Sequence, residues 1–300
     1  MNAADHPLQG SITPLITPFK GDGIDFDTYA SLVRRHIEAG GHGVLVNGTS
    51  AEPSTLTIAE RNQLVDVAIE AAAGQTTVVA ATGSQSFAET CALTEHATKA
   101  GADALLVVTP YYLRPPQRGL VEYYAEVGRR TDLPLLIYHI PGRAAVTLEL
   151  ATLEAIAKRT PTFCGMKHAS VELGLVSDCL RTFGDSFRIF VGLEELSLPM
   201  LALGACGVMN AVGNLVPKRI AALCEAILAG DLERARKHHY ELLDLNRAVF
   251  WDTNPIPIKY LARQLGIIPS NEHRLPMAPP DPTVAKRLDA LLASNPWLRD

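Results

Sequence analysis

The sequence lacks the features of several protein classes. It has no apolar run of the roughly 20 residues that cross a membrane. Residues 1–10 are polar and contain no basic segment followed by an apolar one, which is the pattern of a secretory leader. The net charge is −5, and no basic run is available to bind a nucleic-acid backbone. We therefore expect a cytoplasmic protein that binds neither a membrane nor a nucleic acid.

The patterns of cysteine, histidine and glycine argue against further kinds of site. The five cysteines are scattered without a CxxC pair, so we expect buried thiols in a reducing compartment and no disulfide framework. His238 and His239 are adjacent on a predicted helix and point in different directions, and no histidine–carboxylate cluster follows a strand. The phosphate-binding motifs GxGxxG and GxxxxGKS/T are also missing. We expect neither a metal ion nor a bound cofactor.

Short apolar runs alternate with amphipathic segments of helical length along most of the chain. Eight runs have the near-continuous apolar character of parallel strands that are covered on both faces. They are residues 12–17, 43–47, 77–82, 104–109, 134–138, 163–167, 187–191 and 207–210. Most start about thirty residues apart, the length of one βα unit. Eight such units predict an α/β fold, a (β/α)8 TIM barrel. A doubly wound sheet is the alternative, but it would usually have fewer strands and a glycine-rich phosphate turn.

Local signals also mark the helices and the end of the barrel. Residues 57–60 and 86–89 have the capping-box pattern of a helix start, and a helix over 27–39 is followed by two glycines. After Leu228 the strand pattern stops, and residues 231–249, 257–265 and 282–293 have helical patterns. We predict a catalytic barrel over residues 1–229 and a C-terminal helical region over 230–300.

Lys167 is the first candidate for chemistry, because barrel enzymes place reactive groups at the C-terminal ends of strands. It closes the apolar strand 163–167, whereas the other lysines lie in predicted loops or helices, where we expect a solvated ammonium. Burial disfavours the charged form of an amine, and a neutral amine can attack a ketone carbon. The alternative is a lysine that only reaches solvent at a strand end.

Four other residues follow strands in the same way. Tyr138 could relay protons beside the amine, or it could be an ordinary aromatic residue of a strand. The amides and hydroxyls of Thr49 and Ser50 could hold a carboxylate, or they could form a plain polar turn. Arg143 could pair with a substrate carboxylate, or it could be a surface arginine.

The histidines next to the two strand-end candidates call for a different prediction. His139 follows Tyr138 and His168 follows Lys167. Because strand side chains alternate, we expect both histidines to point away from the barrel interior and to play a structural part.

Taken together, these motifs resemble those of the dihydrodipicolinate synthase/N-acetylneuraminate lyase family. The resemblance covers about residues 10–280, and the motifs occur in the family's order. They are 48–52 (GTSAE), 110–112 (PYY), 138–143 (YHIPGR), 165–167 (GMK), 254–259 (NPIPIK) and 274–276 (RLP).

The resemblance implies a class I aldolase or synthase that uses pyruvate and an aldehyde carrying a carboxylate. It implies that Lys167 forms the Schiff base, that Tyr138 is the acid/base group, and that Thr49 links Tyr138 to Tyr112 of a neighbouring subunit. The amides of Thr49 and Ser50 would hold the pyruvate carboxylate, and Arg143 the carboxylate of the second substrate. A homotetramer made of two tight dimers is also implied.

Several positions depart from the family pattern and bear on the second substrate. Ala51 replaces a glycine and would be strained if this site requires a positive φ. His139 replaces an asparagine, His168 an acidic residue, and Met209, a candidate substrate contact, stands in an altered eighth strand. Residues 192–194 (GLE) replace the GDD that lysine-biosynthetic members often have.

The second substrate therefore stays open between several members of the family. Residues 48–53, 193–200 and 249–255 resemble a subgroup assigned to 2,4-dihydroxyhept-2-ene-1,7-dioate aldolase, which releases pyruvate and succinate semialdehyde. The synthase instead condenses pyruvate with aspartate semialdehyde. A 2-keto-3-deoxy sugar acid aldolase or dehydratase is a further alternative. A non-catalytic sensor of 2-oxo acids is the alternative of another class.

Overall fold

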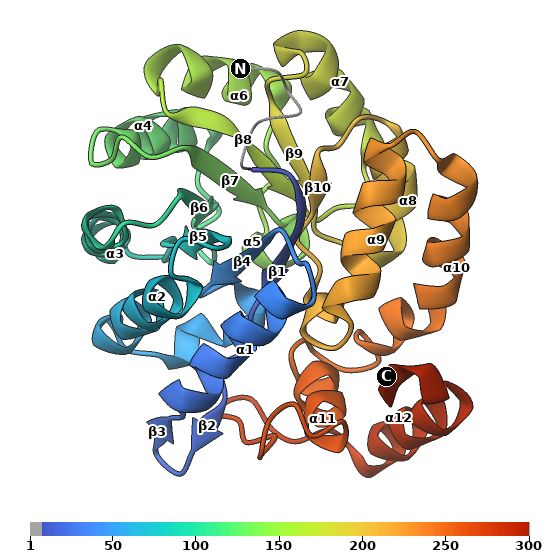
Figure 1. Cartoon of the computed structure of the whole chain (residues 1–300). Helices are drawn as coiled ribbons and strands as arrows, with labels where there is room; N and C mark the ends of the chain where they lie inside the picture. The colour runs from blue at the N-terminus through green and yellow to red at the C-terminus, as the bar shows by residue number, and fades with distance from the viewer. Residues whose placement is uncertain (1–7, 300) are drawn as a thin grey trace.

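Eight parallel strands close into a barrel in the computed structural model, which describes residues 8–299 (Figure 1). The strands follow the order β1-β10-β9-β8-β7-β6-β5-β4 around the barrel. Their bounds are β1 Gly10–Pro14, β4 Gly43–Val46, β5 Thr77–Ala81, β6 Ala104–Val108, β7 Leu135–His139, β8 Phe163–His168, β9 Arg188–Val191 and β10 Gly207–Val208. All eight predicted strands are present, with ends that differ by at most three residues. Residues 1–7, part of the segment in which no leader was predicted, lie outside the described residues.

A ring of helices covers the outside of this barrel (Figure 1). The helices are α1 Phe26–Glu38, α2 Ile58–Ala72, α3 Phe87–Ala100, α4 Gln117–Gly128, α6 Leu150–Arg159, α7 Leu173–Phe183, α8 Ser197–Ala202 and α9 Pro217–Leu228. Buried side chains form two clusters, because successive strand residues face opposite sides. In β6, Leu106 belongs to the cluster inside the barrel, and its neighbours Leu105 and Val107 belong to the layer under the helices. The TIM-barrel prediction is confirmed.

Only one of the two predicted capping boxes forms completely. At α2, the amide of Glu60 donates to Thr57 Oγ1 over 3.2 Å, and the amide of Thr57 donates to Glu60 Oε2 over 2.9 Å. At α3, the amide of Glu89 donates to Ser86 Oγ, but the Glu89 carboxylate accepts the hydroxyl of Ser84 over 2.6 Å. The reciprocal half of the second box was wrongly predicted, because the Ser84 hydroxyl takes the carboxylate.

The C-terminal helices pack onto the barrel's outer layer. They are α10 Leu232–Ala248, α11 Ile256–Gln264 and α12 Pro282–Ser294. Leu242, Leu261 and Leu288 belong to the same hydrophobic cluster as the layer between strands and helices. Figure 1 shows α11 and α12 on the side of the molecule where a short hairpin, β2 Phe19–Lys20 and β3 Gly23–Ile24, leaves the barrel. The hairpin was not predicted. None of the helices in residues 8–299 is long and apolar enough to cross a membrane.

The base of the barrel, where the strands begin, is packed so closely that some positions admit no side chain. A Cβ atom on Gly165 would lie 1.9 Å from the carbonyl oxygen of Arg188 on the next strand. A Cβ atom on Gly41 would lie 1.9 Å from Nε2 of the buried His36. Burial and, to a smaller extent, the nearby His42 together lower the pKa of His36 to about 4. The base is therefore a close-packed floor that holds His36 in its neutral form.

Candidate active site

Lys167 and Tyr138 meet at the mouth of the barrel, where the strands end. β7 and β8 are neighbours, and their pairing sets Tyr138 opposite Lys167. Lys167 Nζ lies 4.5 Å from the centroid of the Tyr138 ring. Both side chains are buried, and Lys167 is 3 % exposed. The two candidate groups are thus held side by side by the register of two neighbouring strands.

The end of the next strand leaves room for the lysine side chain. Gly192 directly follows β9, and a Cβ atom there would lie 3.0 Å from Lys167 Cε and 2.8 Å from Ala169 Cβ. Any larger residue would push against the methylene chain that carries the amine. This glycine was noted in the sequence only as part of an altered motif, and the structure gives it a spatial role.

The turn after β4 brings a hydroxyl to Tyr138. It forms a 3-10 helix over Thr49–Ala51, and Thr49 Oγ1 donates a hydrogen bond to the hydroxyl of Tyr138 over 3.4 Å. The turn is fixed from two sides: Thr17 Oγ1 donates to the carbonyl of Ala51 over 2.8 Å, and Asn254 Nδ2 donates to Ser50 Oγ over 3.1 Å. The turn is therefore an ordered element and not a loose polar loop.

Alanine at position 51 carries no backbone strain. Ala51 lies within the 3-10 helix, and the left-handed residue of this turn is Glu52, with φ 57° and ψ 43°. The strain that the sequence raised for Ala51 is thus absent, because the positive φ falls one residue later. Glu52 was not among the predicted site residues.

A cavity of about 310 Å³ opens beside these groups. Its lining includes Thr49, Tyr138 and Arg143, and Arg143 comes from the short helix α5 Pro141–Ala144. Arg143 is exposed, and its Nη2 donates to the carbonyl of Asn254 over 3.5 Å. Asn47, Glu52 and Asn254 also line the cavity. The guanidinium group of Arg143 is therefore available to an anionic molecule in this cavity.

Four predicted site residues do not line the cavity. Lys167 and Ser50 are buried next to residues that do line it. Met209 is buried in the apolar cluster inside the barrel, together with Tyr138, and packs against its apolar neighbours there. Tyr112 is 91 % exposed and has a left-handed backbone with φ 71°. The structure therefore brings together Lys167, Tyr138 and Thr49, with Ser50 on the same turn, and leaves Tyr112 outside the group.

The histidines that follow Tyr138 and Lys167 contact each other. His139 Nδ1 and His168 Nδ1 are 3.1 Å apart, Leu148 N–H donates to His139 Nε2, and His168 Nε2 faces the carbonyl of Glu172 at 3.0 Å. These contacts require His139 to donate from Nδ1 and His168 to donate from Nε2. Burial lowers the pKa of both rings, that of His139 to about 4, so both are neutral. As predicted, the two rings face away from the barrel interior.

Glu194 places a second buried titratable group close to Lys167. Its Oε1 accepts the amide N–H of Ala211 over 2.7 Å, and Oε2 has no partner among the described residues. Burial raises the pKa of this carboxyl to about 7, opposed by its bond to Ala211 and by the charge of Lys167. In the sequence, Glu194 was noted only as a departure from a GDD motif, because the residue type alone does not show whether a side chain that follows a strand is buried.

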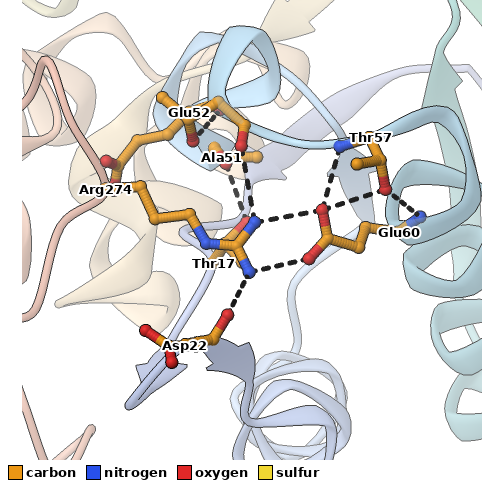
Figure 2. A network of polar contacts seen from close by, with 8 residues as sticks. Thr17, Asp22, Ala51, Glu52, Thr57, Glu60 and Arg274 are labelled. Carbon is orange, nitrogen blue, oxygen red and sulfur yellow. Dashed lines mark hydrogen bonds and ion pairs between the residues drawn. The ribbon is translucent and has the colours of Figure 1, made fainter.

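The prediction that only Lys167 is a buried lysine is wrong. Lys259, in α11, is 0 % exposed, and its Nζ lies 2.9 Å from Glu52 Oε1. His273 Nδ1 lies 3.1 Å from the same oxygen. Nearby, Arg274 binds the carboxylate of Glu60, and Figure 2 shows its guanidinium between Glu60 and the carbonyl of Asp22. The C-terminal region thus reaches the turn at the barrel mouth.

Comparisons with known proteins agree with this geometry. The model of the dihydrodipicolinate synthetase family matches residues 7–295. The chain belongs to this family. It is accordingly an enzyme that makes or cleaves a carbon–carbon bond in small molecules.

Individual relatives cover almost the whole chain. It is 44 % identical to the 4-hydroxy-tetrahydrodipicolinate synthase of Thermus thermophilus over 282 residues, 94 % of each chain. The crystal structure of dihydrodipicolinate synthase from Aquifex aeolicus matches with a TM-score of 0.94 and 38 % identity, covering 96 % of this chain and 98 % of that one. A chloride-inhibited synthase from Acinetobacter baumannii, complexed with pyruvate, matches with a TM-score of 0.92 and 32 % identity, covering 95 % and 98 %.

Proposed function

We propose that Lys167 forms a Schiff base with pyruvate, and that the enzyme joins this pyruvate to an aldehyde carrying a carboxylate, as a 4-hydroxy-tetrahydrodipicolinate synthase does. The observation that carries the proposal is the pairing of buried Lys167 with Tyr138, whose hydroxyl accepts a hydrogen bond from Thr49. The names of the relatives and the pyruvate complex of one of them support the choice of substrate.

The proposed reaction follows from these groups. The neutral amine of Lys167 adds to the keto carbon of pyruvate, and the resulting carbinolamine loses its hydroxyl as water when Tyr138 supplies the proton. Loss of a methyl proton gives an enamine, whose carbon forms the new bond to the aldehyde carbon. Hydrolysis or transfer of the imine then frees Lys167.

Two anion contacts would orient the substrates. The amides of Thr49 and Ser50 begin a 3-10 helix, where N–H groups have no acceptor within the helix, and they are therefore free to hold the pyruvate carboxylate. The exposed fork of Arg143 would pair with the carboxylate of the aldehyde. Met209 would contribute apolar packing under the site.

Tyr112 is proposed to act in a neighbouring subunit. Its ring is almost fully exposed in one chain and is carried on a left-handed residue that directs it outward. A tight dimer would bury the ring and complete the hydroxyl relay with Thr49, and two such dimers would form the homotetramer that the family resemblance implies. We place this enzyme in the cytoplasm, in keeping with its five free cysteines. We also propose that residues 1–229 carry the chemistry and residues 230–300 shape the rim.

A 2,4-dihydroxyhept-2-ene-1,7-dioate aldolase is the second candidate, and Leu193 favours it. Leu193 packs against the interior cluster that contains Tyr138. Succinate semialdehyde lacks the amino group of aspartate semialdehyde, and an apolar side chain here offers that amino group no partner. Coupled assays with the two aldehydes separate the candidates. Equal inactivity with both would leave the sugar acid alternatives.

Borohydride trapping tests the chemistry. Reduction in the presence of pyruvate should add one pyruvate-derived mass to the peptide containing Lys167, and Lys167→Ala should remove both the adduct and turnover while the protein stays folded. An adduct on another residue, or turnover by the alanine variant, would refute the mechanism. Binding of pyruvate without exchange of its methyl protons would instead indicate a sensor of 2-oxo acids.

A further inference from the structure

Glu52 has a backbone conformation that its residue type does not favour. It ends the turn Thr49–Ala51 in the left-handed region, where a residue with a Cβ atom is strained. A glycine would adopt this conformation without cost, so the glutamate side chain must contribute something that offsets the strain. Its carboxylate is buried, with the side chain 1 % exposed.

A buried charge cluster holds this carboxylate. Lys259 Nζ donates to Glu52 Oε1 over 2.9 Å and also donates to the backbone carbonyl of Glu272. His273 Nδ1 approaches the same carboxylate oxygen at 3.1 Å, and the ring of Phe19 lies 4.3 Å from the lysine nitrogen. Buried ion pairs add little net stability, and their best-attested use is to fix one arrangement of the chain. Here the arrangement fixed is that of the catalytic turn against the C-terminal region.

A second contact ties the same two segments together farther from the cavity. Arg274 binds both carboxylate oxygens of Glu60, and it also donates to the carbonyls of Thr55 and Asp22 (Figure 2). Glu60 lies in the first turn of α2, so this contact fixes the end of the loop that runs from Glu52 to α2. The near end is left to the Glu52–Lys259 pair, which adjoins the turn itself.

We propose that Glu52 and Lys259 are positioning residues that aim the amides of Thr49 and Ser50 at the carboxylate of pyruvate. This inference rests on the proposed function. Without the pair, Glu52 has no reason to keep its left-handed conformation, and the turn can relax away from its catalytic shape. A displacement of about 1 Å at a site can cost roughly a hundredfold in activity. The effect should fall on recognition of the carboxylate and not on the amine of Lys167.

The test compares Glu52→Gln, Lys259→Met and the double variant with matched controls. Glu70→Gln in α2 and Lys286→Met in α12 remove the same charges from exposed positions. The measurements are thermal stability, KM and kcat for pyruvate, and borohydride trapping of pyruvate and of acetone. Acetone is a ketone without a carboxylate and reports on the amine of Lys167 alone.

We expect a split between stability and substrate recognition. Each single variant leaves a buried charge unpaired and should melt earlier, whereas the double variant should recover most of the melting temperature. All three should raise the KM for pyruvate by roughly 10- to 100-fold, with a smaller change in kcat, because the turn is no longer held. Acetone trapping by the double variant and all properties of the controls should match the wild type.

Other outcomes overturn the inference. Recovery of both stability and KM in the double variant would mean that the pair is only structural. Equal losses of pyruvate and acetone trapping would mean that the whole site is disturbed. A wild-type chain that traps no pyruvate overturns the proposed function and this inference with it, whereas pyruvate trapping that is equal in wild type and variants overturns the inference alone.

Discussion

The mouth and the base of this barrel differ in backbone conformation and in packing. Five of the six non-glycine residues with positive φ among the described residues lie in the loops that follow strands, at the mouth: Asn47, Glu52, Tyr112, Arg114 and Ala145. Buried polar atoms without a protein partner among the described residues occur in both regions, on Asn47, Glu52 and Glu194 at the mouth and on His36 at the base. At the base, Gly41 and Gly165 instead let backbone and rings pack at distances that no side chain tolerates.

The difference shows how one fold divides two demands. Backbone strain costs stability, and it persists where it prepares a site for a ligand. Close packing at the base stabilises the fold and offsets the strain at the mouth. Substitutions at the mouth should therefore change activity more than stability, and substitutions at the base should do the reverse.

The largest expected effect is on activity at the mouth. Tyr138→Phe keeps the ring beside Lys167 and removes only the hydroxyl, so kcat/KM should fall by roughly 10²- to 10⁴-fold, the contribution of one acid/base group. The melting temperature should stay close to that of the wild type. Steady-state kinetics and calorimetry on one preparation check both values. A large loss of stability would break the proposed division between mouth and base.

The corresponding change at the base should act on stability. Gly165→Ala sets a methyl group against the carbonyl of Arg188, and the neighbouring strands must move apart. We expect the free energy of unfolding to fall by about 1–3 kcal/mol or more, the usual cost of overpacking. Denaturant titration measures this loss. The protein that remains folded should keep kcat within a fewfold of the wild type, and inactive folded protein would contradict the comparison.

Acidity should act on the two regions with opposite signs. At the base, neutral His36, with its pKa of about 4, resists protonation, so the unfolded chain binds more protons below pH 6.5, and stability falls as the pH drops toward 4. Glu194, with its pKa of about 7, keeps a proton that the unfolded chain releases above pH 4.5, so its contribution is lost as the pH rises toward 7.

A single variant isolates the two opposing effects. Glu194→Gln removes the opposing carboxyl, and stability should then fall more steeply between pH 7 and pH 5, by at most about 3 kcal/mol. Melting curves at the two pH values measure the change. Parallel curves for wild type and variant would show that Glu194 titrates as an ordinary carboxyl.

The smallest effect should come from the relay. Thr49→Val removes the donor to the Tyr138 hydroxyl, and the 3.4 Å contact is long for a hydrogen bond. We expect kcat to fall by roughly fivefold, since one neutral hydrogen bond is worth about 1 kcal/mol. Thr49→Ser, which keeps the hydroxyl, should retain most of the activity. Equal losses in the serine and valine variants would argue against a relay through this hydroxyl.

The predictions from sequence succeeded where the signal is local. Each strand is an apolar run of its own, and Lys167 and Tyr138 stand out because a polar group ends such a run. The Glu52–Lys259 pair could not be found in this way, because 207 residues separate its members. A lysine on an amphipathic helix has the same pattern whether it meets solvent or a buried carboxylate. The β2–β3 hairpin is too short to produce a strand pattern.

The His139–His168 pair has an evolutionary consequence. Each ring satisfies a nitrogen of the other, so a chain that acquired one histidine alone would bury an unmatched polar group. The two positions should therefore change together along a lineage, and exchanging one of them between relatives should cost more than exchanging both. Two apparent departures from the family pattern then count as one inherited character, located behind the catalytic strands and not in the cavity.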